Sequence, residues 1–298
     1  MCRAVDKRSV IGPYDSATGE YIHRAEEVAV LKARSVSLII ALLWAGNVYA
    51  TTVNVGLGAA NLFAVLGGTA VTNTGPSSIN GSLGLWSGTS ITGFPPGTVS
   101  GTIDTANALA MQAQMDLTGA YNVAAAQPCG GVLTGQNLGG QTLTAGVYCF
   151  ASSAQLNGTL ILNAQGDANA VFIIQVGGTL TTLSSSQVTI INGGTGNNVF
   201  WQVGGSATLG TSSQFAGNIL ALSNISLDAG ADISCGRALA LNGAVTMDTN
   251  SVSISGTGCS AGIATAPEPG TATFLSMGLL LGLAAYARRS CGLSKRAA

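Results

Sequence analysis

Hydrophobic and polar residues alternate in short runs along most of the chain. Examples are Thr179-Leu180-Thr181 and Ser206-Ala207-Thr208-Leu209, in which hydroxyl or small residues take turns with aliphatic ones. Successive side chains of a β-strand point to opposite faces, so these runs predict strands with Thr and Ser on one face and aliphatic residues on the other. Asn-Gly, Gly-Gly and Asp-Ala-Gly steps separate the runs and supply the turns between them.

The alternating runs recur along the chain at intervals of about twenty residues, which is typical of a solenoid built from stacked rungs. A Thr or Ser followed by an apolar residue marks Thr142-Leu143, Thr159-Leu160, Thr179-Leu180, Thr208-Leu209, Ser226-Leu227 and Thr246-Met247. The block Gln175–Gly178 is repeated as Gln202–Gly205. The inward-facing residues predict a narrow aliphatic core whose larger members are Phe172, Phe200, Trp201 and Phe215.

The segment from Ile103 to Gln127 breaks this pattern, because it is rich in Ala and its apolar residues follow helical spacing. It predicts a helix capped by Asp104 or Thr105 and ended by Pro128. A helix of about twenty residues is about 30 Å long. Six stacked rungs span about 29 Å, so the helix is expected to lie along the solenoid and cover one side.

Titratable groups are scarce in the central part of the 298-residue chain. Between Thr51 and Ala266 there is no Lys, Glu or His, and Arg237 is the single basic residue. This inventory excludes a Ser-His-Asp or Cys-His nucleophile, a Schiff-base lysine, a histidine metal site and a P-loop. The net charge of −1 leaves no basic surface for nucleic acid. We expect a protein that is not an enzyme and that has no cofactor and no metal.

The N-terminal part of the chain has the pattern of a secretory signal. Lys32 and Arg34 precede an apolar run from Val36 to Gly46, and Ala50 ends a small-x-small cleavage pattern. We therefore predict an N-terminal extension over residues 1–34, a signal peptide over 35–50 and an exported domain over 51–266. Because signal peptides start close to the initiator, translation is expected to begin nearer the apolar run than Met1.

The C-terminal segment, residues 267–298, resembles a PEP-CTERM sorting signal. Pro267-Glu268-Pro269 is followed by an apolar stretch from Thr271 to Ala287 and then by Arg288 and Arg289. The resemblance implies transient membrane insertion and cutting by an exosortase-type processing enzyme. A plain C-terminal membrane anchor is the alternative. Both interpretations place the domain outside the inner membrane, either secreted or at the cell surface.

Four cysteines lie in the predicted exported domain, which fits an oxidising compartment. We favour sequential pairing, Cys129 with Cys149 and Cys235 with Cys259, among the three possible connectivities. A four-thiolate zinc site is the alternative, but the four residues lack the C-x2-C spacing of such sites.

Several long blocks of the domain resemble the bacterial and fungal ice-binding-like family. They are Leu57–Gly84, Gly93–Val99, Leu133–Phe150, Val199–Ala221 and Gly236–Asn250. The resemblance implies an all-β fold with one long helix: a right-handed, discontinuous β-solenoid of triangular cross-section with an α-helix packed along one side. It also implies that N-terminal strands close over later rungs.

The resemblance implies further that the domain binds ice through a flat, threonine-rich face. The nearest matches to the family's Thr-Ala/Gly-x-Thr/Asn-like pattern are Thr179 with Thr182, Thr208 with Thr211, and Thr246 with Thr249. The resemblance therefore implies that these six threonines bind ice. Positions i and i+3 of a flat strand point to opposite sides, so a shared face needs a bulge or corner within each match. The aligned rung Ser226–Ala229 contains Asp228, whose carboxylate would interrupt an ordered water layer.

Two other functions remain open from the sequence. A non-catalytic extracellular matrix or adhesion module would have extracellular polysaccharide as its partner in place of an ice crystal surface. A polysaccharide-active enzyme or a calcium site would use Asp228, Asp232 and Asp248. In each case we expect a monomer.

Overall fold

A computed structural model describes residues 55–256 of the chain. The predicted N-terminal extension, signal peptide and sorting segment lie outside the described residues. Within residues 55–256, no helix is long and apolar enough to cross a membrane.

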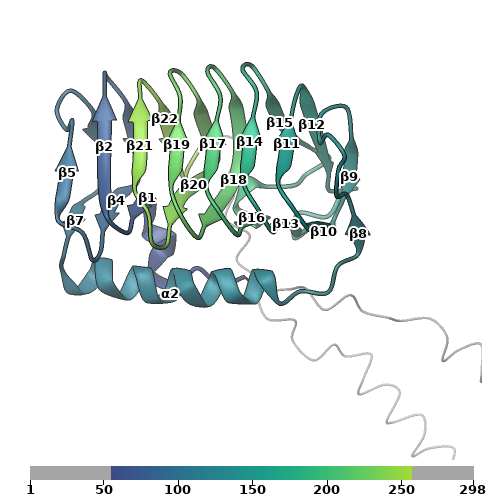
Figure 1. Cartoon of the computed structure of the whole chain (residues 1–298), viewed down its shortest axis with the longest axis horizontal. Helices are drawn as coiled ribbons and strands as arrows, with labels where there is room; N and C mark the ends of the chain where they lie inside the picture. Colours follow the sequence, from purple (N-terminus) through teal and green to yellow (C-terminus); the bar gives the residue numbers. More distant parts are fainter. Residues whose placement is uncertain (1–54, 257–298) are drawn as a thin grey trace, which may run out of the picture. The chain divides into compact units, whose positions relative to one another are not determined.

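The strands stack into a three-sided solenoid whose strand pairs are all parallel (Figure 1). One side is a separate sheet, which we call the front sheet because it faces the viewer in Figure 1. Its seven strands are, in spatial order, β11 (Ala154–Leu156), β14 (Leu180–Thr182), β17 (Ala207–Leu209), β19 (Ile225–Leu227), β21 (Val245–Asp248), β2 (Ala70–Thr74) and β5 (Ser90–Thr92).

The other two sides form one continuous sheet of fifteen strands, which we call the wrapped sheet. One of its sides contains β8 (Gly131–Val132), β10 (Gly146–Phe150), β13 (Phe172–Val176), β16 (Val199–Val203), β1 (Phe63–Gly67), β4 (Ser82–Leu85) and β7 (Ile103–Thr105). The other side contains β9 (Thr142–Thr144), β12 (Thr159–Asn163), β15 (Gln187–Ile191), β22 (Ser251–Ser253), β3 (Ser78–Asn80) and β6 (Thr98–Val99). Two long strands, β18 (Gln214–Ala221) and β20 (Asp232–Ala240), belong to both sides.

The long strands turn the corner between the two sides through a bulge. The register of β18 with β20 shifts between Ala216 and Asn218, and Gly217 between them has a φ of +103°. A Cβ atom on Gly236 of β20 would lie 1.9 Å from the carbonyl oxygen of Gly217. Glycine at both positions therefore allows the two backbones to bend together.

The N-terminal strands close against the C-terminal ones, which confirms the discontinuous solenoid. β2 pairs with β21, β1 pairs with β20, and β3 pairs with β22. One rung consequently takes two of its sides from β21 and β22 and its third side from β1, so both ends of the domain build it.

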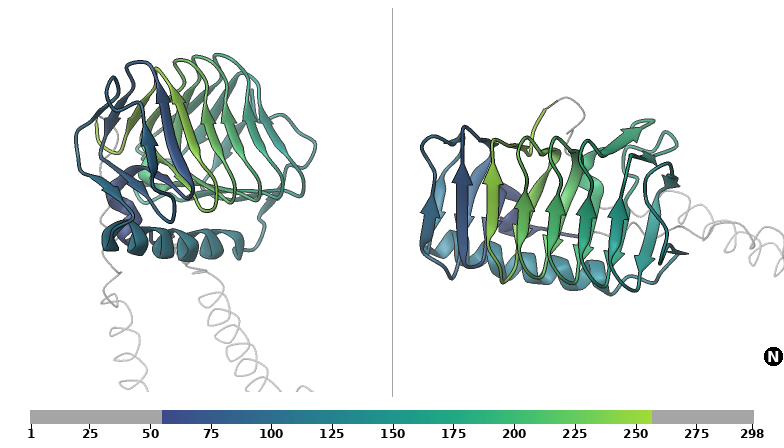
Figure 2. Two further views of the ribbon diagram at one scale, coloured as in Figure 1. Left: turned by 60° about the vertical axis from the view of Figure 1, so that its left-hand side comes forward. Right: turned by 45° about the horizontal axis from the view of Figure 1, so that its top comes forward.

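The predicted helix is present as α2 (Ala108–Ala125), and its 18 residues agree with the expected length of about twenty. The expected caps were wrong: Asp104 and Thr105 lie in strand β7, and the side chain of Asn107 accepts from the Ala110 N–H at 2.9 Å. α2 runs along the stack from the end at β7 as far as β13 (Figures 1 and 2). Its buried stripe, which allows close approach to the wrapped sheet, is Ala110, Ala113, Gln114, Leu117, Ala120 and Ala124.

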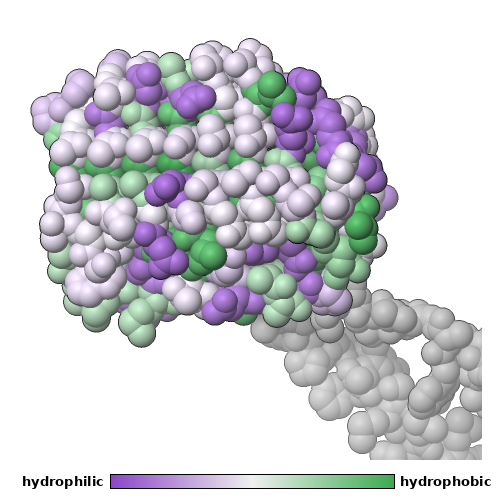
Figure 3. Space-filling model, viewed as in Figure 1, coloured by the Kyte–Doolittle hydropathy of each residue, from purple (hydrophilic) through white to green (hydrophobic). Residues whose placement is uncertain are grey.

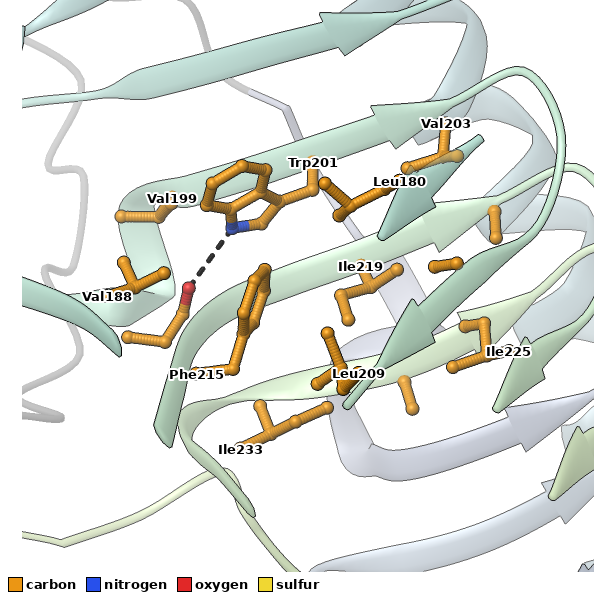
Figure 4. Close-up of a cluster of buried hydrophobic side chains, with 14 of the residues drawn as sticks. Leu180, Val188, Val199, Trp201, Val203, Leu209, Phe215, Ile219, Ile225 and Ile233 are labelled. Carbon is orange, nitrogen blue, oxygen red and sulfur yellow. Dashed lines mark hydrogen bonds between the residues drawn. The ribbon is translucent and has the colours of Figure 1, made fainter. Parts of the chain in front are cut away.

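Aromatic residues fill the solenoid interior where the sequence predicted, with one exception. Trp201 donates from Nε1 to the carbonyl of Ala216 at 3.1 Å, and its ring centroid lies 4.8 Å from that of Phe215 (Figure 4). Phe172 lies in the same core. Phe200 instead packs between the wrapped sheet and α2, because it is adjacent to Trp201 and neighbouring strand residues point to opposite faces.

The structure joins Cys129 to Cys149, which confirms the first predicted disulfide. This bond ties the segment after α2 to β10. Cys235 is also disulfide-bonded. Its predicted partner, Cys259, lies outside the described residues.

Two short 3₁₀ helices complete the fold. One, η1 (Gly58–Leu62), precedes β1, and the other, η2 (Gly196–Asn198), precedes β16.

Candidate functional site

The outward-facing residues at the middle of the front-sheet strands form one row in register. Strand pairing places one residue from each strand beside the next, and we call the set the hydroxyl row: Gln155, Thr181, Thr208, Ser226, Thr246, Thr72 and Thr92. Neighbouring members are about 4.8 Å apart, the distance between paired strands. Six of the strands contribute Thr or Ser.

A second row lies on the same surface, two residues earlier along the chain, at or just before the start of each strand. Its members, the flanking row, are Ser153, Thr179, Ser206, Asn224, Ala244, Ala70 and Ser90. These side chains are small and mostly hydroxyl-bearing. Thr179 donates from Oγ1 to Ser153 Oγ at 3.0 Å, which links two neighbouring strands. The two rows together form an array about 6.7 Å wide along the strand direction.

Neither row contains a charged residue. In Figure 3, which views the molecule from this side, the surface over these strands is mostly pale and therefore of intermediate hydropathy. Strand residues between the rows, such as Ala207, Ile225 and Val245, are buried in the core. The front sheet thus presents a neutral, weakly polar surface supported by an aliphatic interior.

The basic residue of the domain lies away from this surface. Arg237 of β20 is 3% exposed and donates to the side-chain oxygens of Asn61 and Asn218, both at 2.7 Å, and to the main-chain oxygen of Asn61. Burial lowers the pKa of its guanidinium to about 10, so it stays charged at neutral pH. Arg237 therefore caps amide and carbonyl oxygens where the N-terminal segment closes on β20.

The six predicted ice-binding threonines do not share one row. Thr208 and Thr246 lie in the hydroxyl row, and Thr179 lies in the flanking row. Thr211 and Thr249 are exposed in the turns that follow β17 and β21, beyond both rows. Their contact with ice stays a prediction.

Thr182 requires a correction, because it is only 2% exposed and points into the molecule. Its Oγ1 lies 2.9 Å from Ser213 Oγ. The reason is strand alternation: Thr179 faces outward, so the residue three positions later faces inward. In this structure Thr182 has no surface with which to contact ice.

Several members of the hydroxyl row were missed from the sequence. Thr181 pairs with Thr208, whereas sequence analysis aligned Thr179 with Thr208. The repeated block offered the right signal, since Gln175 pairs with Gln202 and the same offset aligns Thr181 with Thr208. Thr72 and Thr92 carried no such signal, because their strands join the front sheet through the closure of the N-terminal segment.

The aspartates do not gather into one site. Asp228 and Asp248 lie two residues beyond the hydroxyl row, at the edge of the front sheet, so Ser226 and not Asp228 occupies the row. Asp232 belongs to the wrapped sheet, where it accepts from the Ser251 N–H at 2.7 Å. Among residues 55–256, no cluster of three or more His, Cys, Asp or Glu side chains is arranged to hold a metal ion.

Comparison with known proteins finds a family model and several relatives that match the chain. The model of the ice-binding-like family matches residues 65–253. An ice-binding protein of Nostoc sp. (strain HG1) is 59% identical over 197 residues, which cover 66% of this chain and 73% of that protein.

Two solved structures are also similar. The crystal structure of an ice-binding protein from the Antarctic ascomycete Antarctomyces psychrotrophicus has 42% identity and a TM-score of 0.65, over 67% of this chain and 98% of that one. That of an ice-binding protein from an Antarctic biological consortium has 46% identity and a TM-score of 0.65, over 67% of this chain and 90% of that one.

Proposed function

The chain belongs to the ice-binding-like family, and we propose that its domain adsorbs to ice crystals through the hydroxyl and flanking rows and so inhibits ice recrystallisation. The observation that carries this proposal is the in-register alignment of Thr and Ser on consecutive strands of the front sheet, free of charged side chains. Ice is a repeating lattice of water, and a repeating neutral array is suited to bind it.

Threonine suits this task for two physical reasons. Its hydroxyl exchanges hydrogen bonds with water, and its methyl group limits the orientations that neighbouring water can adopt. Its β-branched side chain has few rotamers, so little side-chain entropy is lost when the array meets a surface. Many weak contacts at fixed spacing then add together.

The absence of charged residues from both rows also favours adsorption to ice. A carboxylate or ammonium group holds its own tightly bound water and would compete with the lattice for it. Asp228 and Asp248 lie beyond the rows, at the edge of the front sheet. Neutral donors and acceptors can keep their hydrogen bonds to water both when the protein is free in solution and when it is bound to ice.

We infer that the domain is exported and acts outside the cell, secreted or at the surface, as a non-catalytic monomer. The disulfide between Cys129 and Cys149 supports this, because such bonds persist in oxidising compartments. Processing by an exosortase-type enzyme, with transient membrane insertion of residues 267–298, belongs to the same proposal.

The test is ice shaping and recrystallisation inhibition by the protein purified from an oxidising, secreting host. We expect faceted crystals and smaller grains than in buffer containing an unrelated protein of equal concentration. Absence of both effects at micromolar concentration would contradict the proposal. Binding to exopolysaccharide in the same preparation, without any effect on ice, would instead favour a matrix or adhesion module.

A further inference from the structure

A set of buried polar side chains follows the corner where the front sheet turns into the wrapped sheet. We call these residues the polar spine. All of them are at most 6% exposed: Asn73, Ser77, Thr182, Ser186, Ser213 and Asn250. Buried polar groups are costly unless they are hydrogen-bonded, so their partners indicate what they hold together.

In the half of the spine near β11, the bonds cross from rung to rung. Ser186 Oγ donates to the carbonyl of Leu156 at 2.9 Å, and Ser213 Oγ donates to that of Leu183 at 3.1 Å. Thr182 Oγ1 lies 2.9 Å from Ser213 Oγ and accepts from the Gly210 N–H, also at 2.9 Å. Side chains therefore fasten β11 to β14 and β14 to β17 at this corner.

The half near β5 is fastened in the same way by two asparagines and a serine. Asn250 Nδ2 donates to the carbonyls of Asp228 and Ala231 at 2.8 and 2.9 Å. Its N–H donates to Ser77 Oγ at 2.9 Å, and Ser77 Oγ donates to Asn73 Oδ1. Asn73 Nδ2 then donates to the carbonyl of Gly93, after β5, at 2.8 Å.

The two halves meet at Ala231, where the rung has no polar side chain to contribute. Main-chain bonds continue across this point, since the Ser212 N–H donates to the carbonyl of Ala229 at 3.0 Å. The fastening thus runs along the front sheet from β11 to β5, with a single step that depends on the main chain.

Such a ladder matters because paired strands normally twist by about 20° per step, and flat sheets are stabilised by specific side-chain ladders. Over many strands an ordinary twist would fan the hydroxyl row out of a plane. In Figure 1 the front-sheet strands instead stand side by side without fanning. A satisfied hydrogen-bond network in a low-dielectric interior holds one arrangement more firmly than apolar packing does.

We propose that the polar spine positions the ice-binding array: it sets the rung-to-rung alignment of the hydroxyl row, and its members act on ice only through that row. The expected effect on ice rests on the proposed function, whereas the expected effect on strand alignment does not. Thr182 is the decisive member, because it follows Thr181 in the chain and its hydroxyl bonds the strand that holds Thr208.

The experiment compares three variants of the secreted protein with the unaltered chain. Thr182→Val removes the hydroxyl while keeping a β-branched side chain, and Thr182→Ser restores it. Gln114→Met is the matched control, because Gln114 also makes two buried hydrogen bonds to main-chain carbonyls, those of Ala240 and Leu241, on the side covered by α2. Circular dichroism establishes that each variant is folded at the assay temperature.

We expect Thr182→Val to raise the concentration needed for recrystallisation inhibition about tenfold, because a small misalignment repeats along the array. Amide hydrogen exchange should become faster in β14 and β17. Thr182→Ser should restore both properties. Gln114→Met should leave ice activity and front-sheet exchange unchanged.

A folded Thr182→Val protein with unchanged ice activity and unchanged exchange would overturn the proposal, and so would an equal loss of ice activity in Gln114→Met. If Thr182→Val does not fold, Ser213→Ala removes the same link from the other side and carries the same expectations. If the unaltered chain has no effect on ice, the proposed function fails, and the exchange rates alone then decide whether the spine holds the front sheet.

Discussion

Thr181 and Thr182 are neighbours in the chain, yet Thr181 joins the outward hydroxyl row while Thr182 is buried with its Oγ1 2.9 Å from Ser213 Oγ. One residue type thus serves two roles, distinguished only by which side of the strand it occupies. The outward residue meets water, and the inward one fastens two rungs.

The middle of the hydroxyl row should tolerate no bulky side chain. Replacing Thr208 by Tyr places a ring in the middle of the array and should abolish most ice activity, since adsorption needs many simultaneous contacts. The melting temperature should change little, because the side chain points to solvent. The matched control is Thr159→Tyr, an exposed strand position on the wrapped sheet. Equal inhibition of ice recrystallisation by the two variants would contradict ice binding through the front sheet.

The disulfide between Cys129 and Cys149 should stabilise the domain without affecting ice binding. It closes a loop of 20 residues, for which chain entropy gives about 3 kcal/mol of unfolding free energy. The double variant Cys129→Ala/Cys149→Ala should lose about that amount in urea unfolding and keep its activity per folded molecule. A double variant is needed in place of a reductant, which would also reduce the bond made by Cys235.

Arg237 should hold the N-terminal segment against β20. Arg237→Met leaves oxygens of Asn61 and Asn218 without their charged donor, at an expected cost of about 2–3 kcal/mol. Lys at this position should recover only part of the loss, because it lacks the planar fork that reaches both asparagines. In Arg237→Met, amide exchange should become faster in β1, which pairs with β20, than in β13. An equal increase in both strands would contradict the proposed role of Arg237.

The alanine stripe of α2 should be intolerant of larger residues. Ala120 is 1% exposed against the wrapped sheet, so Ala120→Leu should lower the unfolding free energy by about 1–3 kcal/mol through overpacking. Ala125→Leu, an exposed position on the same helix, is the control and should be nearly neutral. Thermal unfolding of the two variants measures the difference.

The aspartates at the edge of the front sheet should be dispensable for ice binding. Asp228→Asn removes a carboxylate that lies beyond the hydroxyl row, so ice shaping should persist. Polysaccharide turnover that disappears in this variant would restore the enzymatic alternative and overturn the non-catalytic assignment.

The sequence by itself determined the character of this protein. Alternation between residues such as Leu180 and Thr181 sets which side chains face outward, and the recurrence of that alternation requires stacked rungs. The scarcity of titratable residues removes most catalytic chemistry, and the Ala-rich segment had to form the helix. These properties depend only on composition and on the spacing of residues along the chain.

Only the tertiary structure decided which threonines stand in one row. Alternation by itself is indifferent to a shift of two residues, so it could not tell whether Thr179 or Thr181 lies beside Thr208. The repeat of Gln175–Gly178 as Gln202–Gly205 favours Thr181, but only the strand pairing establishes it. Alternation also could not place Thr72 beside Thr246, because that contact forms when the N-terminal strands close on the C-terminal rungs. Register between rungs depends on turn lengths and on packing between distant segments, and neither is written in the spacing of a single strand.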